Sequence, residues 1–295
     1  MKRIWTLCAA LLSVVSMASA QAPAAAPAPK MTCCSRPTAG ANATEAFAML
    51  ATNEDFSGGH DAPLPYSYEG LGETIEFKTT DGQTAKAFEI KSNVRSDKYL
   101  FVIHEWWGLN DYIRKEAATY AKELKGVNII ALDLYDGQVA TTADEAGKLM
   151  QAVKNERAEA IIKGVLLYAG PNAKVSSVGW CFGGGWSLQT ALLAGPKAVG
   201  CVMYYGMPEK DVAKLKTLNT DVLGIFATQD KWINQEVVGQ FRKDMAVAKK
   251  KVTVVNYDAD HAFANPSNPK YSKEFAAQAH TLVVDYLRKN FKLKG

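Results

Sequence analysis

Hydrophobic positions along this chain change their spacing in a regular way from residue 73 onward. Short apolar runs rich in β-branched and aromatic residues, which favour strands, alternate with stretches whose apolar residues recur every three or four positions, as on one face of a helix. The strand-like runs cover residues 74–78, 85–90, 99–103, 127–134, 175–178, 198–205, 222–227 and 252–257. The helical patterns cover residues 111–124, 143–168, 186–194, 235–249 and 272–290.

This alternation predicts an α/β fold in which a mostly parallel sheet is covered by helices on both faces. The first two runs have no helical pattern between them, so we expect them to form an antiparallel edge of the sheet. The chain has 295 residues, of which 48% are hydrophobic, and can therefore bury one full α/β core. We expect one such domain at residues 73–295.

The first twenty residues have the pattern of a signal peptide. Lys2 and Arg3 precede an apolar run at residues 4–15, and the Ala-Ser-Ala sequence at residues 18–20 has the form of a cleavage site. The run is too short to span a bilayer comfortably as a mature helix. We expect residues 1–20 to be removed and the protein to be exported, to the periplasm or the medium. Residues 21–72 are interpreted as an Ala/Pro-rich linker and an N-terminal extension.

The charge of the chain is close to balanced. The formal net charge of +4 falls to +2 (4 minus 2) when Lys2 and Arg3 are removed, and no basic cluster is present. A net charge this small does not indicate a nucleic-acid partner. We expect a monomer that acts on a small molecule and has no membrane association after cleavage.

Four cysteines remain after residue 20, namely Cys33, Cys34, Cys181 and Cys201. Cys33 and Cys34 are adjacent and could pair with each other or with another chain, and the sequence leaves both possibilities open. Cys201 lies in an apolar run, where we expect it to be buried. No Cys-x-x-Cys pair is present, which argues against a thiol-based redox protein using Cys181 with Cys201.

The sequence Gly-Trp-Cys-Phe-Gly at residues 179–183 stands between a strand-like run and a helical pattern. In a nucleophile elbow, the glycines two before and two after the nucleophile permit a strained turn and a close approach of neighbouring backbone. A thiol at the start of a helix also faces unpaired N–H groups and the positive end of the helix dipole, which favour the thiolate. Cys181 is therefore the candidate nucleophile; the alternative is an inert buried cysteine in a glycine-rich turn.

A cysteine nucleophile needs a histidine as base, and the chain has four histidines. His60 lies in a Gly/Asp/Pro-rich stretch and His280 on a helical pattern, so we expect both to be structural or solvated. His104 does not begin a zinc-binding helix motif, because Gly108 stands where the second histidine would be. His261, in a polar loop after a strand-like run, is the predicted base.

The acid that orients the histidine follows the nucleophile and precedes the histidine in α/β-hydrolase chains. Asp230 fits this order and closes the run at residues 222–227, at the carboxyl end of a strand where open α/β sheets bind ligands. Asp258 and Asp260 are close to His261 in sequence, but neighbouring loop residues rarely point at one another. The alternative for Asp230 is the N-cap of a helix.

Several motifs, in this order along the chain, resemble the dienelactone hydrolase family of α/β-hydrolases. They are His-Glu-Trp-Trp-Gly at residues 104–108, Asp-Leu-Tyr at 133–135, Gly-Trp-Cys-Phe-Gly-Gly at 179–184, Gln-Asp at 229–230 and His-Ala-Phe at 261–263. The resemblance covers the chain from about residue 73 to its end. It implies an α/β-hydrolase fold and a catalytic triad of Cys181, His261 and Asp230.

The resemblance also implies roles for residues around the triad. Glu105 would interact with the resting thiol and help to deliver a thiolate when substrate binds, which would limit oxidation of the nucleophile. The elbow supplies one oxyanion donor, the backbone N–H of Phe182, and the resemblance points to the N–H of Trp106 as the second. Without the resemblance, Glu105 reads as an ordinary polar residue at a strand end.

Aromatic residues near the strand ends could wall a pocket for a planar substrate or belong to the core. The candidates for the pocket are Tyr135, Trp107 and Trp232, with Trp106, Trp180 and Trp186 as further possibilities. Dienelactone hydrolases carry arginines for a substrate carboxylate after the Asp-Leu-Tyr segment and after the histidine. Here Gly137 and Asn265 occupy those stretches, so we expect a preference for neutral substrates.

These observations predict an exported hydrolase of carboxylic ester or lactone bonds that needs no metal or organic cofactor. The alternative is a non-catalytic small-molecule-binding protein of the same fold. The absence of a triad residue would indicate such a binding protein, and no triad residue is missing.

Overall fold

The structure is a computed structural model that describes residues 42–293. The predicted signal peptide, the Ala/Pro-rich linker, and Cys33 and Cys34 lie outside the described residues. Within residues 42–293, no helix is both long and apolar enough to cross a membrane.

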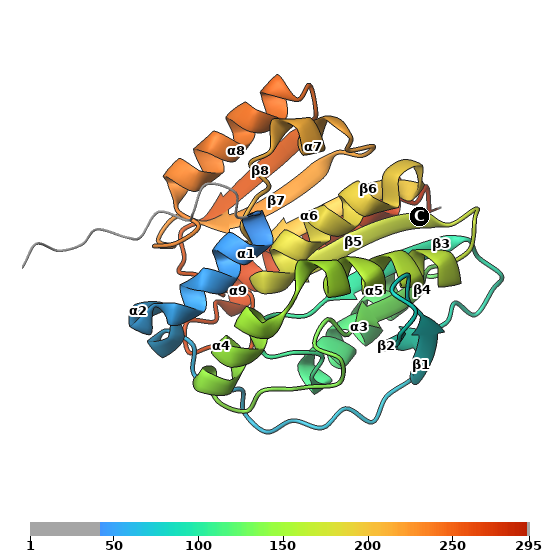
Figure 1. The fold of residues 1–295 in the computed structure, drawn as a ribbon, viewed down its shortest axis with the longest axis horizontal. Helices are drawn as coiled ribbons and strands as arrows, with labels where there is room; N and C mark the ends of the chain where they lie inside the picture. The colour runs from blue at the N-terminus through green and yellow to red at the C-terminus, as the bar shows by residue number, and fades with distance from the viewer. Residues whose placement is uncertain (1–41, 294–295) are drawn as a thin grey trace, which may run out of the picture. The chain divides into compact units, whose positions relative to one another are not determined.

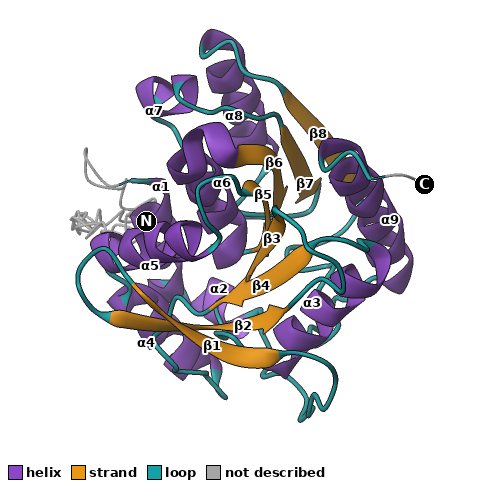
Figure 2. Ribbon diagram, turned by 90° about the vertical axis from the view of Figure 1, so that its right-hand side faces the viewer, coloured by secondary structure: helices purple, strands orange, loops and turns teal. Residues whose placement is uncertain are grey.

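An eight-stranded sheet forms the centre of the fold, in the order β1-β2-β4-β3-β5-β6-β7-β8 (Figures 1 and 2). The strands are β1 (Glu73–Lys78), β2 (Thr84–Ile90), β3 (Lys98–Ile103), β4 (Asn128–Leu132), β5 (Lys174–Trp180), β6 (Ala198–Tyr204), β7 (Val222–Ala227) and β8 (Val252–Tyr257). β2 pairs antiparallel with both β1 and β4, whereas the other neighbouring strands are parallel. The predicted mostly parallel sheet and its antiparallel edge are both confirmed.

Helices cover both faces of this sheet, as Figure 2 shows. On one face lie α3 (Asp111–Glu123) and α9 (Lys273–Asn290), and on the other α5 (Asn155–Tyr168), α6 (Phe182–Ala194) and α8 (Gln235–Val247). Every residue of β4 and β7 is buried. Their continuous apolar sequences, without the alternation of a half-exposed strand, follow from burial on both faces.

The helical pattern predicted at residues 143–168 is two helices rather than one. α4 (Ala143–Ala152) starts at a capping box in which Thr142 and Glu145 exchange hydrogen bonds, and α5 follows after a short break. Val153 and Lys154 have extended backbone, with ψ angles of 118° and 130°, which ends the helical hydrogen-bond ladder. The apolar periodicity continues across the break because both helices bury apolar residues.

The N-terminal extension also contains helices. α1 (Ala43–Ala48), a 3₁₀ turn η1 (Met49–Thr52) and α2 (Glu54–Gly58) belong to the same compact unit as the sheet, and α1 packs on α4 and α6 (Figure 1). Asn42 and Glu45 form a capping box at the start of α1, and the side chain of Asn53 caps α2. We call residues 43–60 the cover segment. The remaining helices are α7 (Val212–Lys216) and η2 (Gly195–Lys197).

Candidate active site

Cys181 occupies a sharp turn between β5 and α6. Its backbone has φ 56° and ψ −118°, a conformation that non-glycine residues rarely adopt, and α6 begins at the next residue. The turn brings the thiol to the carboxyl end of the parallel strands. This geometry is that of a nucleophile elbow.

The glycines on either side of Cys181 are needed for steric reasons. A Cβ added at Gly179 would lie 2.0 Å from the carbonyl oxygen of Gly183, and one added at Gly183 would lie 2.4 Å from the carbonyl oxygens of Ile103 and His104. These neighbours are backbone atoms, which have little freedom to move away. Any side chain at these two positions would therefore force β5, α6 and the end of β3 apart.

His261 joins Cys181 to Asp230 in one line of hydrogen bonds. The Sγ of Cys181 lies 3.4 Å from Nε2 of His261, and Nδ1 of His261 lies 2.6 Å from Oδ2 of Asp230. The three residues are 1%, 4% and 3% exposed, respectively. The structure thus brings together the three residues proposed from the sequence as nucleophile, base and acid.

Asp230 uses its second carboxylate oxygen to fix the loop before α8. Oδ1 accepts hydrogen bonds of 2.9 Å from the backbone N–H groups of Trp232 and Ile233. The two interpretations of Asp230 are therefore compatible: one oxygen caps the following turn and the other orients His261. Because both oxygens are engaged, the carboxylate is held in one orientation.

Burial and pairing change the acidity of the buried groups. Burial lowers the pKa of His261, but the charge and hydrogen bond of Asp230 outweigh this effect and raise that pKa well above its ordinary value. Burial raises the pKa of Cys181, and the hydrogen bonds from His261 and the N–H of Phe182 offset this only in part. The helix N-terminus was expected to favour the thiolate, but burial has the larger effect on the pKa of Cys181 and acts in the opposite direction.

Glu105 lies just beyond β3 with its carboxyl group buried. It accepts a hydrogen bond of 3.3 Å from the hydroxyl of Tyr205 and another from the side-chain amide of Asn265. Burial raises the pKa of Glu105 to about 7, although the charge of His261 and these two bonds act in the opposite direction. Within residues 42–293, Glu105 makes no hydrogen bond to Cys181, but its charge contributes to the raised pKa of the thiol.

Two backbone donors stand near the elbow. The N–H of Phe182 is the first of α6 and has no acceptor within the helix. The N–H of Trp106 has no hydrogen-bond acceptor among the described residues. The N–H of Trp106 is therefore unpartnered among the described residues, whereas the N–H of Phe182 is directed at the thiol of Cys181.

The cover segment closes over the triad. The ring of His261 has its centroid 6.5 Å from that of Phe47, 5.9 Å from that of Phe56 and 5.6 Å from that of His60. His60 is only 4% exposed, and burial followed by the nearby His261 lowers the pKa of His60 to about 3, so its imidazole is neutral. His60 was expected to be structural or solvated, but it is buried beside His261 because the packing of α1 and α2 brings it there.

A cavity of about 490 Å³ opens beside Glu105, between α3, α9 and the loop after His261. Of the predicted pocket residues, Trp107 lines this cavity, whereas Tyr135 packs on His104 and Phe182, and Trp232 packs on Phe56 and His261. Other residues that line it are Trp180, Tyr204, Asn265, Lys115, Lys273, Glu116, Glu123 and His280. Cys181 does not line it. The cavity reaches Glu105, but the sulfur is sealed behind the surrounding side chains.

The family model for dienelactone hydrolases matches residues 86–291. The chain belongs to the dienelactone hydrolase family. The match begins in β2 and ends just after α9, so it includes Cys181, Asp230, His261 and Glu105. The cover segment lies upstream of it.

Curated relatives in this family are similar over most of the chain. Protein usf of Aquifex pyrophilus is 26% identical in an alignment of 236 positions that covers 74% of this chain and 98% of that protein. A putative carboxymethylenebutenolidase of Aquifex aeolicus is 25% identical, over 75% of this chain and all of that protein. The carboxymethylenebutenolidase of a Pseudomonas strain is 26% identical, over 64% of this chain and 84% of that enzyme.

Solved structures of the family share the fold. A putative dienelactone hydrolase from Klebsiella pneumoniae has a TM-score of 0.62 at 22% identity and covers 74% of this chain and 99% of its own. A dienelactone hydrolase-like promiscuous phosphotriesterase from metagenomic libraries has a TM-score of 0.63 at 22% identity and covers 75% and 99%. The architecture is therefore the α/β-hydrolase fold of this hydrolase family.

Proposed function

We propose that this dienelactone hydrolase relative hydrolyses carboxylic ester or lactone bonds through Cys181, His261 and Asp230. The observation that carries the proposal is the unbroken line of hydrogen bonds from Sγ of Cys181 through both imidazole nitrogens of His261 to Asp230. Nucleophile, base and acid occur in this arrangement in acyl-transfer enzymes on several folds.

The first half of the reaction forms a thioester. Nε2 of His261 takes the proton of the Cys181 thiol, Sγ attacks the carbonyl carbon, and the bond to the leaving oxygen breaks as His261 returns the proton to that oxygen. Asp230 stabilises the imidazolium that forms in between, in keeping with the raised pKa of His261. The N–H groups of Phe182 and Trp106 are the donors for the tetrahedral oxyanion.

The second half releases the acid. A water molecule gives a proton to His261 and attacks the thioester carbon, and the bond to Sγ breaks as the sulfur regains a proton. The same residues, Cys181, His261 and Asp230, carry out both halves of the reaction, so no further acid or base is required.

Glu105 is proposed to hold the site in its resting state. Its carboxyl group is engaged by Tyr205 and Asn265, and its charge disfavours the thiolate of Cys181. A substrate carbonyl that draws the sulfur toward the oxyanion donors would relieve this effect. The thiolate would then form only when there is a carbonyl to attack.

The cavity beside Glu105 indicates a neutral, partly aromatic substrate. The described residues that line it include five Trp and Tyr side chains (Trp107, Tyr112, Trp180, Tyr204 and Tyr271) and two lysines, but no arginine. Glu105, Glu116 and Glu123 oppose those lysines. Asn265, at a position where an anion-binding arginine was considered, bonds to Glu105 instead.

This proposal predicts a preference for a neutral lactone over a carboxylated analogue of the same ring. A charge-assisted hydrogen bond contributes about 1.5–3 kcal/mol, so its absence lowers the preference for an anion by about tenfold or more. The measurement is kcat/KM for the two lactones. A higher value for the carboxylated lactone would assign a substrate-binding role to a cation such as Lys115 or Lys273.

The experiment that tests the function is a screen of aryl esters, thioesters and lactones with three proteins. These are the wild type, Cys181→Ala, and the matched control Cys201→Ala, which removes the other buried cysteine of the described chain. We expect Cys181→Ala to lose at least about 1000-fold in kcat with an unchanged far-UV spectrum, and the control to retain activity. Turnover at the wild-type rate in Cys181→Ala would remove Cys181 from the mechanism. Binding without turnover in the wild type would support the non-catalytic alternative.

The place of action is proposed to lie outside the cytoplasm, since residues 1–20 have the pattern of a signal peptide. Intact-mass measurement of the natively expressed protein tests this. A cytoplasmic species that retains residues 1–20 would contradict it.

A further inference from the structure

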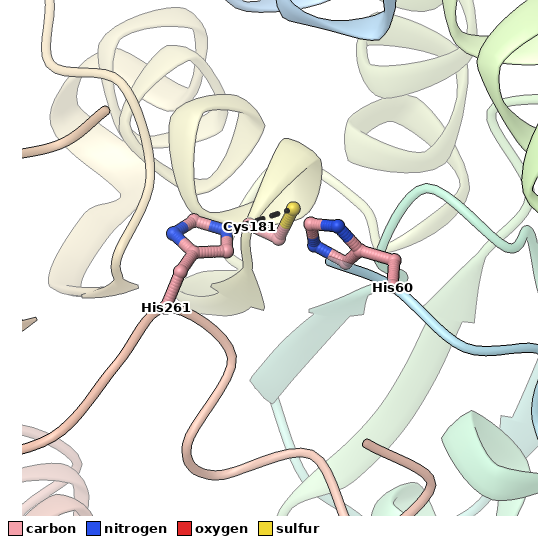
Figure 3. Close-up of side chains that lie close together, drawn as sticks. All are labelled: His60, Cys181 and His261. Atoms are coloured by element: carbon pink, nitrogen blue, oxygen red, sulfur yellow. Dashed lines mark hydrogen bonds between the residues drawn. The ribbon is translucent and has the colours of Figure 1, made fainter. Parts of the chain in front are cut away.

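His60, Cys181 and His261 form a buried cluster of metal-ligating side chains, shown in Figure 3. One ligand atom from each residue lies within 4.8 Å of the corresponding atoms of the other two. In Figure 3 the sulfur lies between the two imidazole rings. The triad proposed above uses two of these groups and leaves His60 without a role.

His261 directs Nε2 at the sulfur of Cys181, and the contact made by Nδ1 of His60 leaves Nε2 as the nitrogen of that ring that can bind a ligand. Nδ1 of His60 lies 2.6 Å from the carbonyl oxygen of Phe56, which accepts hydrogen bonds only, so the proton resides on Nδ1 and Nε2 carries a lone pair. Nδ1 of His261 is engaged in the same way by Asp230. Metal-binding histidines are usually held by such a bond to a carbonyl or carboxylate on the outer nitrogen.

Nε2 of His60 has no hydrogen-bond partner among residues 42–293, although it is fully buried. Aromatic rings surround it, with the centroids of Phe56 and Trp106 each 4.6 Å from that of His60. A buried polar atom without a partner destabilises a fold unless a ligand satisfies it. The lone pair of His60 is therefore free to bind an electron-pair acceptor that enters the cluster.

We propose that His60, Cys181 and His261 bind one Zn²⁺ ion, which occupies the nucleophile and fastens the cover segment over it. A thiolate and two neutral imidazoles are a donor set that Zn²⁺ prefers. On binding, Cys181 loses its proton to solvent and the sulfur forms a bond to the metal. The charges of the thiolate and of Asp230 together balance the two charges of the ion, as a buried site requires.

The spacing of the cluster fits this ion after a small contraction. Zn–N bonds of about 2.0–2.1 Å and a Zn–S bond of about 2.3 Å place neighbouring ligand atoms about 3.5 Å apart. The Sγ–Nε2 distance between Cys181 and His261 is already 3.4 Å. Only His60 has to approach the other two, and it belongs to the cover segment, so metal binding would draw that segment onto the triad.

Zinc binding would inhibit hydrolysis at this site and protect Cys181 from oxidation. The metal draws electron density from the sulfur, which makes it a weaker nucleophile toward a carbonyl or a peroxide, and Nε2 of His261 no longer accepts a proton because its lone pair is bound to the metal. The inhibition rests on the proposed function of Cys181, but the binding does not. Removal of the metal restores the nucleophilic sulfur of Cys181 and the proton-accepting Nε2 of His261.

The binding test uses the mature chain with Cys33→Ser and Cys34→Ser, so that these adjacent cysteines do not bind metal. Zn²⁺ affinity is measured by competition with a chromophoric chelator in this protein and in His60→Gln and His280→Gln versions of it. His280 is the matched control, because it is a half-buried histidine outside the cluster that lies beside two other possible ligands, Glu116 and Glu123. We expect one Zn²⁺ per chain, at least tenfold weaker binding in His60→Gln, and no change in His280→Gln. Equal affinity in the His60→Gln protein, or no binding at all, would overturn the proposal.

A second measurement needs no substitution in the cover segment. Co²⁺ bound to the same protein should show the thiolate-to-metal absorption band of a tetrahedral site, and Cys181→Ser should abolish it. A Co²⁺ complex without that band would overturn the proposal even if His60→Gln failed to fold.

Activity separates this proposal from the proposed function. Zn²⁺ should inhibit hydrolysis in step with its binding, a chelator should reverse the inhibition, and His60→Gln should need at least tenfold more Zn²⁺, measured against its own metal-free rate. A chain that binds Zn²⁺ at these residues but hydrolyses none of the substrates would refute the proposed function and leave the metal site standing. A chain whose hydrolysis depends on Cys181 but is insensitive to bound Zn²⁺ would refute the metal site.

Discussion

Glu105 is a carboxyl group whose ionisation the fold disfavours. Its pKa of about 7 lies above the ordinary value of 4.5 because the group is buried. A carboxyl group with a raised pKa in the folded state contributes most to stability below its unfolded pKa. That contribution is lost as the pH rises from about 4.5 to about 7.

The variant Glu105→Gln should remove this pH dependence. We expect the free energy of unfolding of the variant, minus that of the wild type, to increase by roughly 3 kcal/mol between pH 4.5 and pH 8. Urea unfolding of both proteins across this range measures the difference, and other titrating groups cancel because both proteins contain them. A difference that stays constant with pH would show that Glu105 ionises normally in the folded state.

Individual residues of the site were predictable to different degrees. Cys181, Asp230 and His261 each follow a strand, and parallel strands bring their carboxyl ends to one edge of the sheet, so their positions along the chain were enough to group them. The position of His60 depends on how α1 and α2 pack against the domain. The Gly/Asp/Pro-rich sequence around His60 contains no local pattern that predicts how α1 and α2 pack against the domain.

At the scale of elements, the junction of β5 and α6 has no tolerance for a side chain at its glycines. A Cβ at Gly183 would lie 2.4 Å from two backbone oxygens. By contrast, Gly239 lies within α8, and a Cβ there would have no atom within 4 Å. These two glycines differ in their surroundings but both belong to helices.

Alanine at these two positions should have opposite effects. We expect Gly183→Ala to lower the free energy of unfolding by about 3 kcal/mol or more, because the backbone must shift, and Gly239→Ala to raise it by about 0.5–1 kcal/mol through helix propensity. Denaturant unfolding of the three proteins gives both numbers. Loss of stability in Gly239→Ala equal to that in Gly183→Ala would mean that steric approach at the elbow is not the cause.

The sheet was predictable because strand signals are strong where runs of β-branched residues are buried on both faces. The break between α4 and α5 was not, because the apolar period continues through Val153 and Lys154. The helices at residues 43–58 have only four to six residues each. Their N-caps at Asn42 and Asn53, the first with Glu45 three residues later, were nevertheless a readable signal.

At the scale of the whole molecule, the cover segment connects stability with access to the site. Phe56 is fully buried and packs on Trp106 and Trp232, with ring centroids 5.5 Å and 5.0 Å away. Its removal would weaken the contact between the segment and the triad. Phe241 in α8 is buried to a similar extent but belongs to another part of the core.

Phe56→Ala should therefore expose Cys181 more than Phe241→Ala does. Both changes should destabilise the protein by about 3–5 kcal/mol, because each removes a buried ring. The rate at which iodoacetamide alkylates Cys181 under native conditions, read by mass spectrometry at that residue, should increase in Phe56→Ala alone. Equal rates in the two variants would show that the cover segment does not control access.

Because Cys181 is 1% exposed, a substrate reaches its sulfur only in molecules in which the side chains around it, those of the cover segment among them, have moved aside. The apparent affinity is then the intrinsic affinity multiplied by the fraction of molecules that are open. If about one molecule in 100 is open, KM is about 100-fold above its value for the open form. Substitutions in residues 43–60, upstream of the part that the family shares, would thus tune KM over a wide range without altering any group that touches the substrate.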